Sequence, residues 1–269
     1  MTMSIIKLRT TDGLDIAAIH TKATSRALVL WLHGIAVNRD EHLGFFRDGA
    51  ARLANEGFDS LRIDFRGHGE SSGSPADFSL VGQMLDVQAA LRYLSDSYGP
   101  TLPPLFLVAA SFGAPAALFA ALRAPFLIRG LTLLAPVLSF RRTFLEPETA
   151  WAKEIFNAEA LKALPRTNRL DFGDGFAVGA RLIEEMHLIE PERALRDLQQ
   201  RVVVIHGDHD SMVPFAVSEQ LTRGLQNCVF VPVHGMDHGF IDADDEDGVG
   251  ERSQRNKKLI LDTIIEACV

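Results

Sequence analysis

One serine in this sequence lies where a hydroxyl group could act as a nucleophile. The run LVAASFGAPAA, residues 107–117, is apolar apart from Ser111, and Gly113 follows two positions later. A sharp turn from a buried strand into a helix leaves little room for side chains two positions before and after its central residue, here Ala109 and Gly113. Such a turn would lift the hydroxyl clear of the sheet and aim the free N–H groups of the helix at an anion formed beside it. A buried serine that caps a helix is the competing interpretation.

A serine alcohol is a poor nucleophile unless a base takes its proton, and a third group must orient that base. Two later stretches supply candidates for both roles. GDHDSMVP, residues 207–214, contains Asp208 and Asp210, and HGMDHGF, residues 234–240, contains His234 and His238. Each stretch follows an apolar, strand-like run, so a carboxylate and an imidazole could converge on Ser111 at one edge of a sheet.

Apolar runs and helical spacing predict the elements that must position these residues. Six runs are typical of buried parallel strands: 27–32, 59–64, 105–110, 131–136, 201–206 and 228–233. Segments with helical spacing lie between them, at 43–55, 80–98, 112–123, 214–225 and 251–267. Alternating strands and helices predict a mostly parallel, doubly wound α/β sheet.

Two parts of the chain depart from this alternation. At the N-terminus, two strand-like runs flank Asp12-Gly13, which is a strong hairpin signal and predicts an antiparallel edge of the sheet. Between Pro136 and Arg201 we expect helical pieces, at 148–164 and 178–188, and no strand. An insertion of this length is more plausible as a lid over the sheet than as a loop.

Composition and charge limit the class of protein. The 269 residues are 47% hydrophobic, which is enough for a full core in one domain. The formal net charge of −8 argues against a nucleic-acid-binding surface, which needs clustered Lys and Arg. The start of the sequence lacks the pattern of a secretory leader, and no apolar run approaches the ~18 residues of a membrane span. We therefore expect a cytoplasmic protein; its oligomeric state is not readable from the sequence.

Metal and cofactor chemistry is not indicated by the spacing of the side chains. The two cysteines, Cys228 and Cys268, form neither a disulfide framework nor a metal-ligand pattern, and the nine histidines include no HExxH spacing. The acidic run 242–247 lacks the Gly and Glu placement of a calcium loop and is interpreted as a solvated loop. We predict no metal and no cofactor.

Four blocks of sequence together resemble the α/β-hydrolase fold superfamily over nearly the whole chain. They are LVLWLHG at 28–34, DFRGHGESSG at 64–73, AASFGA at 109–114, and HGDHDSMVP with DHGF in the two later loops. Within the superfamily the chain is most similar to the esterases and thioesterases of the serine aminopeptidase S33-like group. The first position of the serine turn is usually glycine in the superfamily, and here it is Ala109.

The resemblance implies an eight-stranded, mostly parallel sheet with helices on both faces and a role for each candidate residue. Ser111 would be the nucleophile, Asp210 the acid and His238 the base, in the superfamily's order, with Asp208 and His234 as less favoured rivals. The backbone N–H groups of Ile35 and Phe112 would form the oxyanion hole. The core would comprise 1–137 and 201–269, and 138–200 would be a helical cap.

The remaining histidines have structural interpretations. His33 and His68 resemble family members that tie loops together by hydrogen bonds. We expect His206 to be packed and His209 to be exposed. Aromatic and apolar side chains of the cap would shape the substrate pocket: Phe140, Phe144, Leu145, Trp151, Phe156, Phe172, Phe176 and Met186. The competing interpretation is that each of them only holds the cap to the core.

The expected function is hydrolysis of a small-molecule carboxylic ester through an acyl-serine intermediate. Thioesters, or transfer of the acyl group from a carrier, would use the same intermediate and stay open. Peptidase action is less favoured, because the cap contains no clear acidic cluster to hold a free amine. The alternative from another class is a small-molecule-binding protein of the same fold with little turnover.

Overall fold

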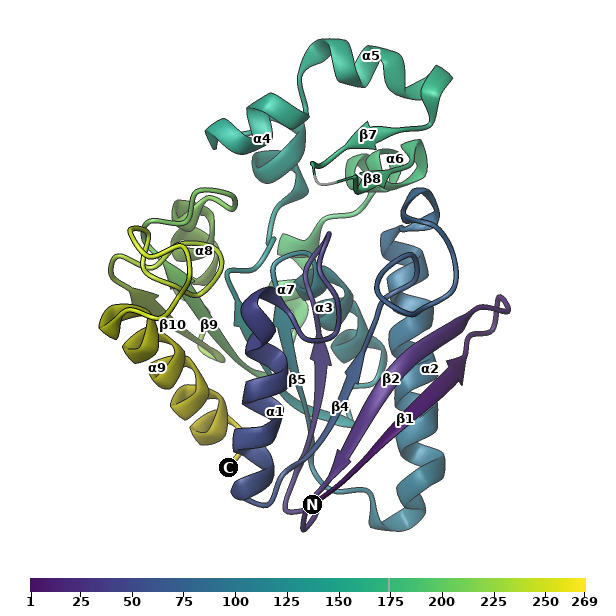
Figure 1. The fold of residues 1–269 in the computed structure, drawn as a ribbon, viewed down its shortest axis with the longest axis vertical. Coiled ribbons are helices and arrows are strands. Elements are labelled where there is room, and N and C mark those ends of the chain that lie inside the picture. Colours follow the sequence, from purple (N-terminus) through teal and green to yellow (C-terminus); the bar gives the residue numbers. More distant parts are fainter. Residues whose placement is uncertain (174) are drawn as a thin grey trace.

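The computed structural model describes residues 1–173 and 175–269, and its centre is a mixed β-sheet (Figure 1). Within the described residues this sheet has eight strands in the order β1-β2-β4-β3-β5-β6-β9-β10. Their bounds are β1 Thr2–Arg9, β2 Asp15–Lys22, β3 Leu28–Leu32, β4 Asp59–Ile63, β5 Leu105–Ala110, β6 Ile128–Leu134, β9 Arg201–Gly207 and β10 Cys228–Val233. The pairs from β4 to β10 are parallel, and β1 and β2 form the antiparallel edge. The predicted α/β class and N-terminal hairpin are confirmed.

Helices cover both faces of the sheet because its strands are apolar on both sides. In β3, Leu28, Leu30 and Leu32 belong to one buried cluster, while Val29 and Trp31 belong to the other. The first cluster packs under α2, α3, α7 and α8, and the second under α1 and α9. The helices are α1 Phe45–Asn55, α2 Leu80–Tyr98, α3 Gly113–Arg123, α4 Ala150–Ile155, α5 Ala158–Thr167, α6 Ala180–Leu188, α7 Pro191–Asp197, α8 Phe215–Thr222 and α9 Glu251–Ala267.

The segment between β6 and β9 corrects two expectations. We expected no strand there, but β7 (Leu170–Asp171) pairs with β8 (Ala177–Val178) in a short antiparallel ladder. The helical piece expected at 148–164 is two helices, α4 and α5, because Asn157 caps the second one by accepting a hydrogen bond from the N–H of Ala160 at 2.9 Å. In Figure 1, α4, α5, α6 and the β7–β8 ladder lie together at one end of the sheet, whereas α7 contacts α3.

That end of the sheet collects the segments that contain the candidate residues. Ser111 directly follows β5, Gly34 and Ile35 follow β3, and the two later loops follow β9 and β10. Because these four strands are parallel to one another, their carboxyl ends meet at the same edge. Among the helices described, none is both long and apolar enough to cross a membrane.

A buried ion pair fixes the loop after β4, which lies next to the same edge. The Arg66 guanidinium donates to Asp86 on α2 at 2.8 Å, and these side chains are 5% and 0% exposed. Its other side binds Asp12 at 2.8 Å. A charge this deeply buried depends on its partner, because water cannot replace the lost contact.

We predict that Asp86→Asn lowers the free energy of unfolding by about 3 kcal/mol, because it leaves the Arg66 charge buried with only Asp12 as a partner. The matched control is Asp15→Asn, which removes the exposed ion pair between Arg9 and Asp15 and should cost less than about 1 kcal/mol. Urea denaturation of the two variants measures the difference. Equal losses would contradict the role assigned to the buried pair.

Candidate active site

Ser111 lies at a strained turn between β5 and α3. Its φ is +46°, a left-handed value that residues with side chains adopt rarely. The turn is tight because a Cβ at Gly113 would lie 2.5 Å from the carbonyl oxygen of Leu32 and 2.6 Å from that of His33. Only glycine fits at this position, as the sequence spacing indicates, while Ala109 is accommodated as a fully buried residue of β5.

Neighbouring strands hold this strained backbone in place. The N–H of Ser111 donates to the carbonyl of Leu134 at 2.9 Å, and the carbonyl of Ser111 accepts from the N–H of Val137 at 3.1 Å. Strain of this kind persists only where the surroundings over-determine the conformation, and it gathers at functional sites. The hydroxyl is thereby presented above the end of the sheet.

Ser111, His238 and Asp210 form a hydrogen-bonded series. His238 Nε2 lies 3.0 Å from Ser111 Oγ, and His238 Nδ1 lies 2.8 Å from Asp210 Oδ2. The carboxylate accepts, so Nδ1 carries the proton, which leaves Nε2 free to accept from the serine hydroxyl. The other oxygen of Asp210 accepts from the N–H groups of Met212 and Val213 at 2.9 and 2.8 Å.

The charges in this series stabilise one another. Burial alone would raise the pKa of Asp210, but the facing imidazole of His238 and the hydrogen bonds outweigh burial and hold that pKa well below its usual range. Burial likewise opposes a charge on His238, but Asp210 outweighs it, and Glu41 and Asp237 add to the effect, so the pKa of His238 is raised. His238 can therefore hold a proton while Asp210 stays ionised.

His206 is a contact of Asp210 that the sequence interpretation missed. It was expected to be packed, and it is fully buried, but its Nε2 also lies 3.0 Å from Asp210 Oδ2. Its Nδ1 lies 2.8 Å from the hydroxyl of Ser218 on α8. The sequence HGDHD gives the four-residue spacing, but the turn after β9 that brings the two side chains together is seen only in the structure. Asp210 is thus held between two imidazoles.

Asp208 and His234, the less favoured candidates for the acid and the base, contact each other instead. His234 Nδ1 lies 2.7 Å from Asp208 Oδ2, and His209 Nδ1 lies 2.7 Å from Asp208 Oδ1. His209 is exposed, as expected, and so is His234. Burial opposes ionisation of Asp208, but hydrogen bonds from both histidines outweigh it and lower the pKa of this carboxyl to about 2.

His33 and His68 tie loops together, and the expectation of a structural role is confirmed. His33 Nε2 accepts from the N–H of Phe65 at 2.9 Å, and His68 Nε2 accepts from the N–H of Ala36 at 3.2 Å. Burial lowers the pKa of His68 to about 4. Both rings are therefore neutral at pH 7, and they connect the loop after β3 to the loop after β4.

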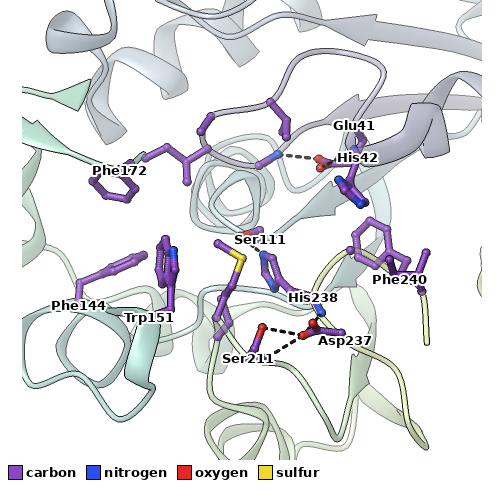
Figure 2. Close-up of a pocket in the computed structure, with 18 residues that line it drawn as sticks. Glu41, His42, Ser111, Phe144, Trp151, Phe172, Ser211, Asp237, His238 and Phe240 are labelled. Carbon is purple, nitrogen blue, oxygen red and sulfur yellow. Dashed lines mark hydrogen bonds between the residues drawn. The ribbon is translucent and has the colours of Figure 1, made fainter. Parts of the chain in front are cut away.

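Glu41 is a second residue that sequence reasoning missed. Its φ of +61° and ψ of 179° fall in a region occupied almost only by glycine. This conformation turns the carboxylate back onto the loop after β3, where Oε2 accepts from the N–H of Gly34 at 2.8 Å (Figure 2). Burial raises the pKa of Glu41, against the effect of that hydrogen bond. No motif marks this residue in the sequence, because the signal is the backbone strain itself.

The expected oxyanion donors belong to two backbone segments next to Ser111. Phe112 directly precedes α3, with helical φ and ψ of −69° and −11°, so its N–H belongs to the free N–H groups at the start of that helix. Ile35 follows Gly34, where a Cβ would lie 3.7 Å from Ser111 Oγ. The loop after β3 therefore approaches the hydroxyl closely enough for its backbone to contact a bound group.

A cavity of about 410 Å³ opens above Ser111 and His238. Phe144, Trp151 and Phe172, from the segment between β6 and β9, form one wall, while His42 and Phe240 lie on the opposite side (Figure 2). Five other side chains expected to shape the pocket are not among its lining residues: Phe140, Phe156 and Met186 are buried in the core, and Leu145 and Phe176 are partly buried against it. For those five side chains, the interpretation that they hold the cap to the core describes their position better.

The acidic run after β10 is a largely solvated loop, as expected, except at its first residue. Asp244, Glu246 and Asp247 are exposed, but Asp242 is only 6% exposed. Its N–H donates to the hydroxyl of Ser253 on α9 at 2.8 Å. This contact ties the loop after β10, which contains His238, to the last helix.

We predict that Glu41→Gln lowers the pKa of His238, because it removes a negative charge that favours the imidazolium. The other groups that act on this pKa, Asp210, Asp237 and the nearby His42, stay the same in the variant. NMR titration of the histidine ring protons measures the shift. In the wild-type protein the midpoint of His238 should lie above its ordinary value of about 6.5. An unchanged or higher midpoint in the variant would contradict the electrostatic contact, and His68, with its midpoint near 4, serves as the internal reference.

A known protein family matches more than half of the chain. The family model described as "Serine aminopeptidase, S33" matches residues 23–174, which include the loop after β3 and the Ser111 turn. A toxin of Vibrio vulnificus, described as "Multifunctional-autoprocessing repeats-in-toxin", is 31% identical over 97 residues, or 36% of this chain. The chain spans only 2% of the length of that curated relative.

Solved esterase structures are similar along nearly the whole chain. Est1E from Butyrivibrio proteoclasticus, with ferulic acid bound, is 19% identical and has a TM-score of 0.74 over 97% of this chain and 98% of that chain. A thermophilic esterase from Thermogutta terrifontis is 18% identical, with a TM-score of 0.67 over 99% and 100% of the two chains. The esterase from Exiguobacterium antarcticum is 17% identical, with a TM-score of 0.68 over 97% and 98%. At these identities the likeness concerns the fold.

Proposed function

This chain belongs to the Serine aminopeptidase, S33 family of α/β hydrolases, and from that premise we propose that it cleaves carboxylic esters through an acyl-Ser111 intermediate. The observation that carries the proposal is the hydrogen-bonded series from the Ser111 hydroxyl through His238 to Asp210. Nucleophilic catalysis by serine needs a base in contact with the hydroxyl and a third group that orients the base. The three side chains fit those roles in that order.

In the first half of the reaction, Ser111 Oγ attacks the ester carbonyl carbon and His238 Nε2 takes the hydroxyl proton. The carbonyl oxygen becomes an anion, and Asp210 stabilises the imidazolium without accepting its proton. The imidazolium then gives that proton to the leaving alcohol as the bond between carbon and the leaving oxygen breaks. Ser111 is left as an ester of the acyl group.

The anion needs donors that are in place before the reaction begins. We assign this role to the backbone N–H groups of Ile35 and Phe112, with the start of α3 adding a favourable dipole. Glu41 acts here as a positioning residue, because its hydrogen bond to the Gly34 N–H fixes the backbone directly before Ile35. A set of oriented donors of this kind typically lowers the barrier by several kcal/mol.

In the second half, a water molecule loses a proton to His238 and attacks the acyl carbon. The bond between that carbon and Ser111 Oγ then breaks, His238 returns the proton to Oγ, and the acid is released. The acyl group could equally come from a thioester, because the intermediate is the same. An alcohol or amine in place of water would make the protein an acyltransferase. The ester remains the preferred substrate class, because two of the solved structures of similar fold are esterases.

We propose that residues 138–200 act as a cap that shapes the acyl site. The cap contributes the aromatic wall of Phe144, Trp151 and Phe172, which suits a flat or apolar acyl group. The similar structure of Est1E contains ferulic acid, an aromatic acid, and this supports an aromatic acyl group as the first class to test. Within the same stretch, α7 packs on α3, so its contacts are those of the core.

Peptidase action is less favoured, although the family description refers to aminopeptidases. Two carboxylates that line the cavity, Glu41 and Asp237, are already engaged by the protein. Glu41 accepts from the N–H groups of Gly34 and His42, and Asp237 Oδ1 accepts from the N–H and hydroxyl of Ser211 at 2.8 and 2.9 Å. A substrate amine would have to share either carboxylate with these donors, which already use both oxygens of Glu41 and Oδ1 of Asp237.

We predict that Ser111→Ala lowers kcat for ester hydrolysis by at least about 10⁴-fold, because the nucleophile is removed while the rest of the site remains. The control is Ser97→Ala, an exposed serine of α2 far from the cavity, which should hydrolyse esters at the wild-type rate. A panel of nitrophenyl esters and thioesters with straight and aromatic acyl groups supplies the substrates and identifies the preferred acyl class.

Two outcomes would contradict the proposal in different ways. Equal rates for the wild-type protein and Ser111→Ala would exclude Ser111 as the nucleophile. Binding of the aromatic acids without turnover of any ester or thioester in the panel would favour the alternative, a small-molecule-binding protein of this fold.

A further inference from the structure

Asp208, His209 and His234 form a compact cluster at the rim of the sheet, here called the rim cluster. One ligand atom of each residue lies within 4.8 Å of the other two. The Asp208 carboxylate lies between the imidazoles, with 2.7 Å from each of its oxygens to one Nδ1 atom. Two ring nitrogens from different loops thus converge on one carboxylate.

The backbone under the rim cluster is fixed by its own hydrogen bonds. The N–H of Asp208 donates to the carbonyl of Val233 at 3.1 Å, and the N–H of His209 donates to that of Met236 at 3.2 Å. Gly235 donates its N–H to Asp208 Oδ1 at 2.8 Å. These bonds continue the parallel pairing of β9 and β10 into the loops, so the three side chains project from a common, rigid base.

The cluster is open to solvent and separate from the ester-cleaving chemistry. The side chains of His234, His209 and Asp208 are 90%, 54% and 31% exposed, so an ion could enter without any movement of the fold. The cavity above Ser111 is lined by other residues of the described chain. The net charge of −8 also favours a cation at the surface.

We propose that the rim cluster binds a divalent transition-metal ion, with Zn²⁺ as the best match. Two imidazole nitrogens and one carboxylate oxygen are a donor set that zinc uses in three-ligand sites, with water at the remaining position. Ca²⁺ and Mg²⁺ prefer all-oxygen sites and are excluded by this donor set. The ion would replace the hydrogen bonds that now join Asp208 to the two imidazoles.

Binding at the rim cluster would join the two loops that contain the proposed acid and base. Asp208 lies two residues before Asp210, and His234 lies four residues before His238. An ion coordinated by both loops binds the folded chain and not the unfolded one, so it stabilises the fold by mass action. An ion at the rim cluster would therefore hold the two loops together and take no part in bond cleavage.

The test uses the untagged, full-length protein after removal of metal by a chelator, with ZnCl₂ as the titrant in isothermal titration calorimetry. The wild-type protein should bind one Zn²⁺, and His234→Gln and His209→Gln should each bind at least about 10-fold more weakly. Both side chains are largely exposed, so these variants should fold normally. The matched control is His187→Gln, an exposed histidine of α6, which should bind like the wild type.

Thermal unfolding gives a second readout. At about 100 times Kd, Zn²⁺ should raise the Tm of the wild-type protein by about 5 °C and leave His234→Gln nearly unchanged. Mg²⁺ should shift neither. The proposal is overturned if the wild-type protein binds no Zn²⁺, or if His234→Gln and His209→Gln bind it as tightly as His187→Gln does.

Discussion

The arrangement of the site follows from one constraint, a carboxylate that must stay ionised without access to water. The side chain of Asp210 is completely buried, and an unpaired charge there would be far too costly to retain. Two backbone N–H groups and two imidazoles, those of His206 and His238, surround its oxygens instead. Because its donors come from β9, the loop after β10 and the loop between β9 and α8, the ionised carboxylate fixes three segments relative to one another. His238 is then held with its free nitrogen toward Ser111.

Strained backbone conformations also fix the positions of the site residues. Ser111 and Glu41 both adopt backbone conformations that favour glycine, and both side chains lie next to Gly34. The close approach of Gly113 to the carbonyl groups after β3 and the hydrogen bonds of His33 and His68 hold the surrounding loops. Residues far apart in the chain therefore meet at one sheet edge, because the parallel strands end there and the loops cannot relax.

The sequence was sufficient for the parts that depend on local patterns. Apolar runs located the strands of the main sheet, the Asp12-Gly13 signal located the hairpin, and the spacing around Ser111 located the strained turn. Two kinds of feature could not be predicted from the sequence. Glu41 and the Asp210 contact of His206 depend on backbone geometry that no motif encodes, and the two-residue strands β7 and β8 are too short to leave a periodic pattern. The cap's aromatic residues have similar chemistry, so only their packing separates the wall of the cavity from the interior.

The most direct test of the account is the identity of the residue that becomes acylated. Treatment of the full-length protein with a serine-directed organophosphonate, followed by peptide mass spectrometry, should give a single adduct on the peptide that contains Ser111. His238→Ala should slow its formation strongly, because the hydroxyl loses its base. An adduct on another serine, or a rate that does not depend on His238, would contradict the account.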